Sequence, residues 1–134
     1  MNPNKLKHLE FIQAVITRMN TNSFLIKAWS ISIVSALFAL SAKDINVNFV
    51  FIAYFSIPLM WLLDGFYLSQ ERKFRDLYNS VRVKDEGNID FSMKTKNYDT
   101  CKNSWMGSTF SRTLLLMYFP LTLVVCLVMV ILRK

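Results

Sequence analysis

Glycine and histidine are scarce in this chain, whose 134 residues include three glycines and one histidine. Three glycines are too few for a glycine-rich loop that cradles a phosphate. The sequence holds no HExxH, CxxC or GxSxG motif, which removes the metalloprotease, paired-thiol and serine-hydrolase signatures. Polar side chains do not cluster inside the apolar runs either, as an intramembrane enzyme would require. We therefore expect a protein that is not an enzyme and that carries no metal or other cofactor.

The two cysteines are equally uninformative about chemistry. Cys101 lies in a polar segment and Cys126 lies inside an apolar run. A pair placed in this way is not expected to form a disulfide, and two scattered thiols make no metal site. Cysteine usage therefore gives no indication of an oxidising compartment.

Long apolar runs are what the chain does contain. Apolar residues make up 53% of it and are gathered into three stretches. A helix needs about 20 residues to cross about 30 Å of hydrocarbon, so the length of each stretch decides whether it can span a membrane. The first stretch is long enough if it begins at Phe24, with Lys27 turning back to the headgroups and Trp29 at interface depth. The sequence predicts an all-α membrane protein with three transmembrane helices, at about residues 24–42, 45–63 and 113–132.

The first two spans are expected to form a hairpin. Lys43–Asp44 would make a very tight connection between them, and Pro58 is expected to bend the second span locally. Residues 1–23 precede the hairpin and show apolar residues at helical spacing, including Leu9, Ile12 and Ile16. This amphipathic helix either packs against other helices or lies in the membrane interface.

Polar residues 20–23 include good N-capping side chains, so a break is predicted between the amphipathic helix and the first span. Beyond the second span, Phe74, Leu77, Tyr78 and Val81 keep helical spacing, so that helix should continue to about Val83. Two pairs of opposite charge are spaced four apart on it, Glu71 with Arg75 and Arg72 with Asp76.

Residues 64–112 are predicted to form a helical cytoplasmic module. Gly87–Asn88 is its expected break, and a short return helix is expected from about Thr100. The third span follows within residues 113–134. The chain as a whole, residues 1–134, is therefore predicted to be a single membrane domain.

Basic residues predict the orientation of the spans. With the N-terminus inside, the cytoplasmic segments hold thirteen of the sixteen lysines and arginines, and only Lys43, Arg133 and Lys134 lie outside. The positive-inside rule therefore predicts that the N-terminus lies in the cytoplasm and the C-terminus outside, in a periplasm or its equivalent. The net charge of +7 fits a surface that meets anionic lipid headgroups.

Asp64, at the end of the second span, is the most notable acid. A carboxylate at this depth is either an interfacial residue paired with Lys27 or Arg112, or a functional group facing a protein interior. In the second interpretation Asp64 belongs to a gate or ion path, together with Ser32 and Ser35.

Small residues on the first span predict a close packing face. Ala28, Ser32 and Ala36 are spaced by four, as are Ser35 and Ala39, and such spacing lets helix backbones approach in lipid. The face packs either within the monomer or between copies. Because three spans alone enclose no pore, a transport function would require a homo-oligomer.

Basic and aromatic residues are interleaved in the 64–112 module, a pattern that suits a nucleotide or another phosphate-bearing ligand and suits anionic lipid equally well. The candidate ligand-binding residues are Arg72, Arg75, Tyr78, Arg82, Lys102, Trp105 and Arg112. Seven acids are interspersed over the same residues, so the module lacks the sustained basic face of a nucleic-acid binder. We expect no nucleic-acid partner.

Three segments carry a family resemblance: HLEFIQAVITRMNTNSFLIKAW at 8–29, LLDGFYLSQERKFRDLY at 62–78 and NSWMGSTFSRTLLL at 103–116. They resemble a group of small bacterial inner-membrane proteins encoded beside TIR-domain proteins in anti-phage, Thoeris-like loci. The resemblance implies that a TIR partner makes a nucleotide signal from NAD, and that the membrane protein senses it on the cytoplasmic face and disrupts the membrane.

Two functions are therefore predicted. The first is a membrane effector of anti-phage defence that oligomerises and permeabilises the inner membrane in response to the nucleotide. The alternative is a membrane anchor that recruits a cytosolic partner protein through residues 64–112, with Phe74–Tyr78 as the recruiting face.

Overall fold

The computed structural model describes residues 2–44 and 47–132, and its regular structure over these residues is helical, with no strand. The long elements are α1 (Pro3–Asp44), α2 (Val47–Val83) and α4 (Arg112–Leu132), and a short α3 (Trp105–Thr109) precedes α4. Two single-turn 3-10 helices, η1 (Glu86–Asn88) and η2 (Lys96–Tyr98), lie between α2 and α3. Among the described residues, α1, α2 and α4 are long and apolar enough to cross a membrane.

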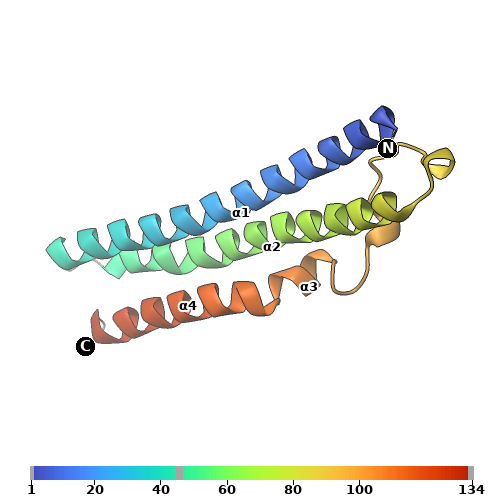
Figure 1. The fold of residues 1–134 in the computed structure, drawn as a ribbon. Coiled ribbons are helices and arrows are strands. Elements are labelled where there is room, and N and C mark those ends of the chain that lie inside the picture. The colour runs from blue at the N-terminus through green and yellow to red at the C-terminus, as the bar shows by residue number, and fades with distance from the viewer. Residues whose placement is uncertain (1, 45–46, 133–134) are drawn as a thin grey trace.

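The three long helices lie side by side as an elongated bundle (Figure 1). The chain reverses direction twice, so α2 runs antiparallel to both α1 and α4 and packs against each of them. The N-terminus and the C-terminus lie at opposite ends of the bundle. We call residues 24–44, 47–68 and 105–132 the apolar half, and residues 3–23 and 69–104 the polar half.

A seven-residue repeat explains why α1 and α2 stay together over both halves. The buried positions of α1 include Leu9, Ile16, Ser23 and Ser30, each seven residues after the last. In α2 they include Val50, Ile57, Asp64 and Glu71, with the same spacing. A seven-residue repeat keeps one face of each helix on its neighbour, as in a coiled coil. Two of these core positions in each helix are polar, and they lie near the middle of the bundle.

The hydrophobic core is divided into two clusters at that polar region. The first, in the apolar half, joins α1, α2 and α4 through Val34, Val50, Ala53, Ile57, Leu114, Tyr118 and Val125. The second, in the polar half, joins α1, α2 and the segment after α2 through Leu9, Ile12, Ile16, Leu77, Val81 and Ile89. Residues 3–23 therefore pack on the C-terminal half of α2. This confirms the prediction that the amphipathic segment packs against another helix.

The predicted helix break at residues 20–23 is wrong, because α1 continues through them without interruption. Capping side chains favour a helix start only where the backbone lacks other partners. Here the neighbouring turns are held on α2 by Ile16 on one side and Ser23 on the other, both buried. Tertiary packing thus overrides the local signal. The predicted connection at Lys43–Asp44 lies at the end of α1, and residues 45–46 lie outside the described residues.

The second span does continue to Val83, as the spacing predicts. The helical module predicted for residues 64–112 is only partly correct, however. Residues 84–104, which we call the strap, are irregular apart from the two 3-10 turns, and the return helix predicted from Thr100 comprises only α3. The strap is held by its contacts instead: Ile89 is buried in the polar-half cluster, and Asn103 donates to the Asp76 carboxylate at 2.5 Å.

A glycine sets how closely α3 approaches α2. A Cβ atom added at Gly65 would lie 2.1 Å from Thr109 Oγ1 and 2.9 Å from Thr109 Cα, so the contact leaves no room for a side chain. The close approach lets Trp61 Nε1 donate to the Thr109 carbonyl at 2.7 Å. On the other flank, Trp105 Nε1 donates to the Leu62 carbonyl at 2.8 Å.

Replacing this glycine should loosen α3. Gly65→Ala is expected to destabilise the protein by about 1–3 kcal/mol, because the methyl group must displace α3 backbone. Gly87→Ala is the matched control, since a Cβ there meets nothing within 4 Å, and it should change stability by less than about 0.5 kcal/mol. Thermal unfolding of the detergent-solubilised protein measures both. Equal stability of the two variants would contradict the packing of α3 on Gly65.

Candidate functional site: a carboxylate shared by three helices

The Asp64 side chain is completely buried at the junction of the two halves. It occupies a core position of the seven-residue repeat in α2, between the two hydrophobic clusters. A charged group removed from water in this way is strongly unfavourable unless other groups pair with it. The partners of its carboxylate therefore decide whether α1, α2 and α4 can pack as they do.

Three side chains from two other helices surround the carboxylate. On α1, Ser23 Oγ donates to Asp64 Oδ1, and Lys27 Nζ lies 2.6 Å from Asp64 Oδ2. On α4, Tyr118 OH donates to Oδ2 at 3.1 Å. Lys27 Nζ also donates to Ser23 Oγ at 2.6 Å, which closes the network. We call Ser23, Lys27, Asp64 and Tyr118 the polar layer.

Of the two interpretations of Asp64, the pairing with Lys27 is present, and the lysine ends at the carboxylate instead of turning towards headgroups. Arg112, the other predicted partner, is exposed and makes no contact with Asp64 among the described residues. Both carboxylate oxygens are occupied by protein donors. Chemically, the layer is therefore suited to holding three helices together. Its part in a gate or ion path stays a prediction.

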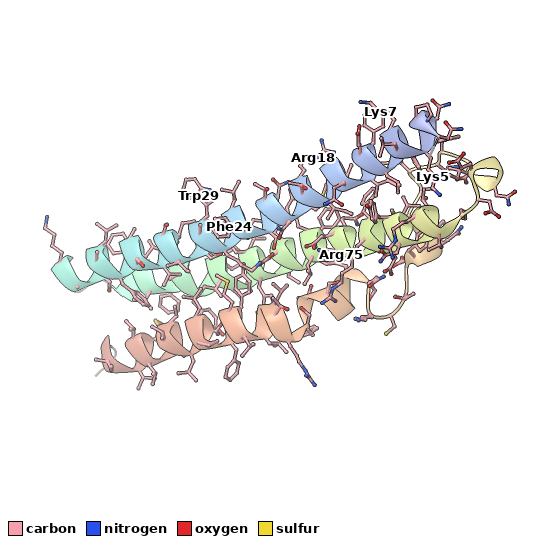
Figure 2. The ribbon with its side chains drawn as sticks, viewed as in Figure 1. Lys5, Lys7, Arg18, Phe24, Trp29 and Arg75 are labelled. Carbon is pink, nitrogen blue, oxygen red and sulfur yellow. The ribbon has the colours of Figure 1, made fainter. Side chains whose placement is uncertain are left out.

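All three tryptophans of the chain lie at the level of the polar layer. Trp29 follows Lys27 by two residues and points outward from α1 (Figure 2). Trp61 stacks on Tyr118 with ring centroids 5.9 Å apart, and Trp105 is bonded to the adjacent Leu62 carbonyl. Tryptophan is enriched where a membrane protein crosses the boundary between lipid and water. The polar layer and this aromatic belt thus mark the same plane of the molecule.

The seven residues proposed for ligand binding do not form one site. Arg72 donates to the Lys102 carbonyl at 3.0 Å, and Arg75 pairs with Glu71 as predicted. The other predicted pair, Arg72 with Asp76, does not form, because the strap supplies partners for both residues. Tyr78 packs against the polar-half cluster. The remaining members lie apart on the surface: Arg82 at the end of α2, Lys102 in the strap, Trp105 on α3 and Arg112 at the start of α4.

The small residues proposed as a packing face are all exposed. Ala28, Ser32, Ala36, Ser35 and Ala39 lie on the side of α1 that contacts neither α2 nor α4, so packing of this face within the monomer is wrong. Ser32 Oγ bonds only the Ala28 carbonyl of its own helix among the described residues. Ser32 and Ser35 are therefore not grouped with Asp64.

Ser23 and Tyr118 are the members of the polar layer that the sequence did not identify. Its capping side chain places Ser23 in a predicted helix break, whereas its spacing of seven from Ile16 and Ser30 places it on the buried stripe of a continuous helix. Tyr118 lies within an apolar run, whose hydropathy gives it no separate role. A tyrosine hydroxyl inside a predicted span needs a hydrogen-bond partner, and that requirement was the available signal.

Removing the charge of Asp64 should destabilise the bundle. Asp64→Asn leaves Lys27 beside a neutral amide, and breaking one side of a buried ion pair costs about 3–5 kcal/mol. Lys27→Met should also be unfavourable, because it leaves the carboxylate buried with hydroxyl donors only. The double variant should lose less than the sum of the two single losses, with a coupling energy of about 1–3 kcal/mol. Denaturation in detergent measures this cycle, and additive losses would show that the pair is not coupled.

Comparisons with protein-family models, with curated proteins and with solved structures give no match for this chain. The resemblance to small membrane proteins of anti-phage loci therefore stays an expectation from the three sequence segments. Any role of the polar layer has to follow from its geometry.

Proposed function

We propose that this protein is a membrane effector that is controlled from the cytoplasm. Its apolar half lies in the bilayer and its polar half projects into the cytoplasm as a helical stalk. A signal received by the polar half changes the packing of α1 against α2, and the polar layer passes that change to the spans. The rearranged spans then assemble and permeabilise the membrane.

One observation carries this proposal: α1 and α2 run without a break from one half into the other, and a single carboxylate at the junction binds all three long helices. A helix pair that is continuous through the junction moves as a unit. Displacing α1 in the polar half therefore pulls Ser23 and Lys27 away from Asp64. A buried carboxylate that loses these partners becomes unfavourable, and this links the two halves energetically.

Exposed apolar side chains support the membrane placement. Phe55, Leu116 and Ile131 are each more than two-thirds exposed, and many other large apolar residues of the same half face outward. An apolar surface of this extent is unstable in water and normal in lipid. The basic residues favour a cytoplasmic location for the polar half.

Assembly is required because three helices packed around a shared carboxylate enclose no channel. The exposed small-residue face of α1 supports contact between copies, since close backbone approach favours helix association in lipid. The sequence resemblance supplies the biological setting: anti-phage defence, with a nucleotide made by a TIR-domain partner as the signal and the bacterial inner membrane as the target.

Permeabilisation should increase when the polar layer is weakened. We expect vesicles that contain Asp64→Asn to release a trapped dye at least about tenfold faster than vesicles with the wild-type protein. The reason is that a loss of about 3 kcal/mol shifts a two-state equilibrium by more than 100-fold. Fluorescence dequenching of the dye measures the release.

The matched control is Ser56→Ala, which removes a hydroxyl that bonds the Ile52 carbonyl of its own helix and leaves both the polar layer and the small-residue face of α1 intact. Adding Lys27→Met to Asp64→Asn should slow the release again, because the unpaired cation is removed. Circular dichroism of each variant checks that the helices are retained. Vesicles that stay as tight with Asp64→Asn as with the wild-type protein would contradict the effector proposal.

The second candidate function is a membrane anchor for a cytosolic partner, and the projecting polar half favours it. Val83, at the end of α2, is 75% exposed and lies at the end of the bundle far from the aromatic belt. In the recruiting face predicted at Phe74–Tyr78, both aromatic side chains are partly buried against the polar-half cluster, and Arg75 and Asp76 between them are exposed. An anchor would leave vesicles tight in every variant, so the dye-release experiment separates the two functions.

A further inference from the structure

A groove lies along the polar half of α1, away from every residue proposed above for ligand binding. Its floor is formed by α1 between Lys7 and Arg18, and Phe91 and Met93 of the strap form one wall. The volume of the groove is about 730 Å³, within the range of small-molecule sites. Most of its lining is apolar, with cationic side chains at both ends.

The two cations lie on the same face of α1, one at each end of the groove. Lys7 and Arg18 are eleven residues apart, slightly more than three helical turns, at a separation of about 16 Å. Both point away from α2 (Figure 2). Lys7 has only an exposed contact of 3.4 Å with Glu10, and Arg18 has no ion-pair partner among the described residues. Exposed pairs of this kind are weak, so both cations are free to bind an anion.

Aromatic rings lie between the cations. Phe11 is exposed on the floor, and Lys7 Nζ lies 5.7 Å from the centre of its ring. Phe91 stands across the groove with a backbone φ of 52°, a conformation that bulky residues rarely adopt. Ile89, two residues before Phe91, is buried in the polar-half cluster. The Phe91 ring packs edge-to-face with the His8 ring, and the two ring centroids are 5.6 Å apart. Flat apolar surfaces therefore face the groove from both α1 and the strap.

His8 gives the groove a polar group with an unused hydrogen-bonding atom. The side chain is about 95% buried and lines the groove, and its Nε2 has no hydrogen-bond partner among the described residues. Buried polar atoms in folded proteins nearly always have such a partner. Nε2 is itself shielded from solvent, so a bound molecule reaches it only when a neighbouring side chain such as Phe91 shifts.

We propose that this groove binds a soluble aromatic anion of the nucleoside phosphate class. The base packs between Phe11 and Phe91, the phosphates pair with Lys7 or Arg18, and a shift of the Phe91 ring lets His8 Nε2 exchange a hydrogen bond with the ligand. A binding event here joins the strap to α1 and so acts on the helix whose later turns carry Ser23 and Lys27. The inference deepens the proposed function and rests on it only for the effect in the membrane.

A lipid headgroup offers the same phosphate chemistry, but the position of the groove disfavours it. Arg18 and Lys7 precede Ser23, the nearest member of the polar layer on α1, by five and sixteen residues, which places them about 8 and 24 Å along the helix axis from that layer. The headgroup region of a bilayer is only about 5–8 Å thick on each side. The Arg18 end of the groove therefore lies at the edge of the headgroup region, and the end that holds Lys7, His8 and Phe91 lies beyond it, within reach of soluble ligands.

The single histidine of the chain makes a direct test simple. The full-length protein, purified in detergent with a histidine-free tag and with isotope-labelled histidine, gives one imidazole signal in the NMR spectrum. Titration with ADP should shift that signal in a saturable manner. Adenosine alone and pyrophosphate alone should each bind at least about tenfold more weakly than ADP, because each lacks one of the two interactions.

Two charge-matched double variants locate the site. Lys7→Gln with Arg18→Gln should weaken ADP binding by about 10- to 100-fold, the range expected for charge-assisted hydrogen bonds. Arg82→Gln with Lys102→Gln removes the same charge outside the groove and should leave binding unchanged. The proposal is overturned if ADP leaves the imidazole signal unshifted, if the second variant loses binding and the first does not, or if short-chain phosphatidylglycerol shifts the signal and ADP does not.

This result is independent of the dye-release experiment. If ADP binds but the vesicles remain tight in every variant, the proposed nucleotide site is supported and the proposed effector function is rejected. If vesicles with Asp64→Asn leak but ADP does not bind, the proposed effector function is supported and the proposed nucleotide site is rejected.

Discussion

Burial of the Asp64 carboxylate is the constraint on which the rest of the structure depends. Its two oxygens are held by Ser23, Lys27 and Tyr118, so α1 and α4 must both reach α2 at one level. Only a close and well-aligned set of donors offsets the loss of hydration. The requirement fixes the register of the three helices between two hydrophobic clusters that have no such directionality. It also places the carboxylate at the level of the aromatic belt, where the surface changes from the apolar half to the polar half.

Much of the fold was predictable from the sequence because apolar runs are a strong signal. The three helices that are long and apolar enough to cross a membrane, and the extension of α2 to Val83, follow directly from hydrophobic length and periodicity. The continuity of α1 was not predicted, because residues 20–23 carry the side chains of a helix cap and only packing on α2 keeps them helical. The irregular strap was missed for the converse reason: Ile89 and Asn103 hold it through contacts with distant helices, which a local pattern cannot show.

The candidate sites were predicted less completely. The pairing of Asp64 with Lys27 could be predicted because both residues lie at the same expected depth in the membrane. Tyr118 reaches Asp64 only because α4 packs antiparallel to α2, which the local sequence does not show. The basic and aromatic residues of the 64–112 module form no single site, because Arg72 and Arg75 are already paired within the protein. The groove joins α1 to the strap, two segments about 80 residues apart. No local sequence pattern relates His8 to Phe91, so their contact is visible only in the folded chain.

The central claim is that the polar layer divides the chain into a half embedded in lipid and a half exposed to the cytoplasm. The two native cysteines test it directly, because both are free and exposed on the protein surface, Cys101 in the strap and Cys126 within α4. A membrane-impermeant maleimide should label Cys101 rapidly in inside-out vesicles, leave Cys126 unlabelled there, and label neither in intact cells. Labelling of Cys126 at the rate of Cys101, or labelling of Cys101 from outside intact cells, would contradict the account.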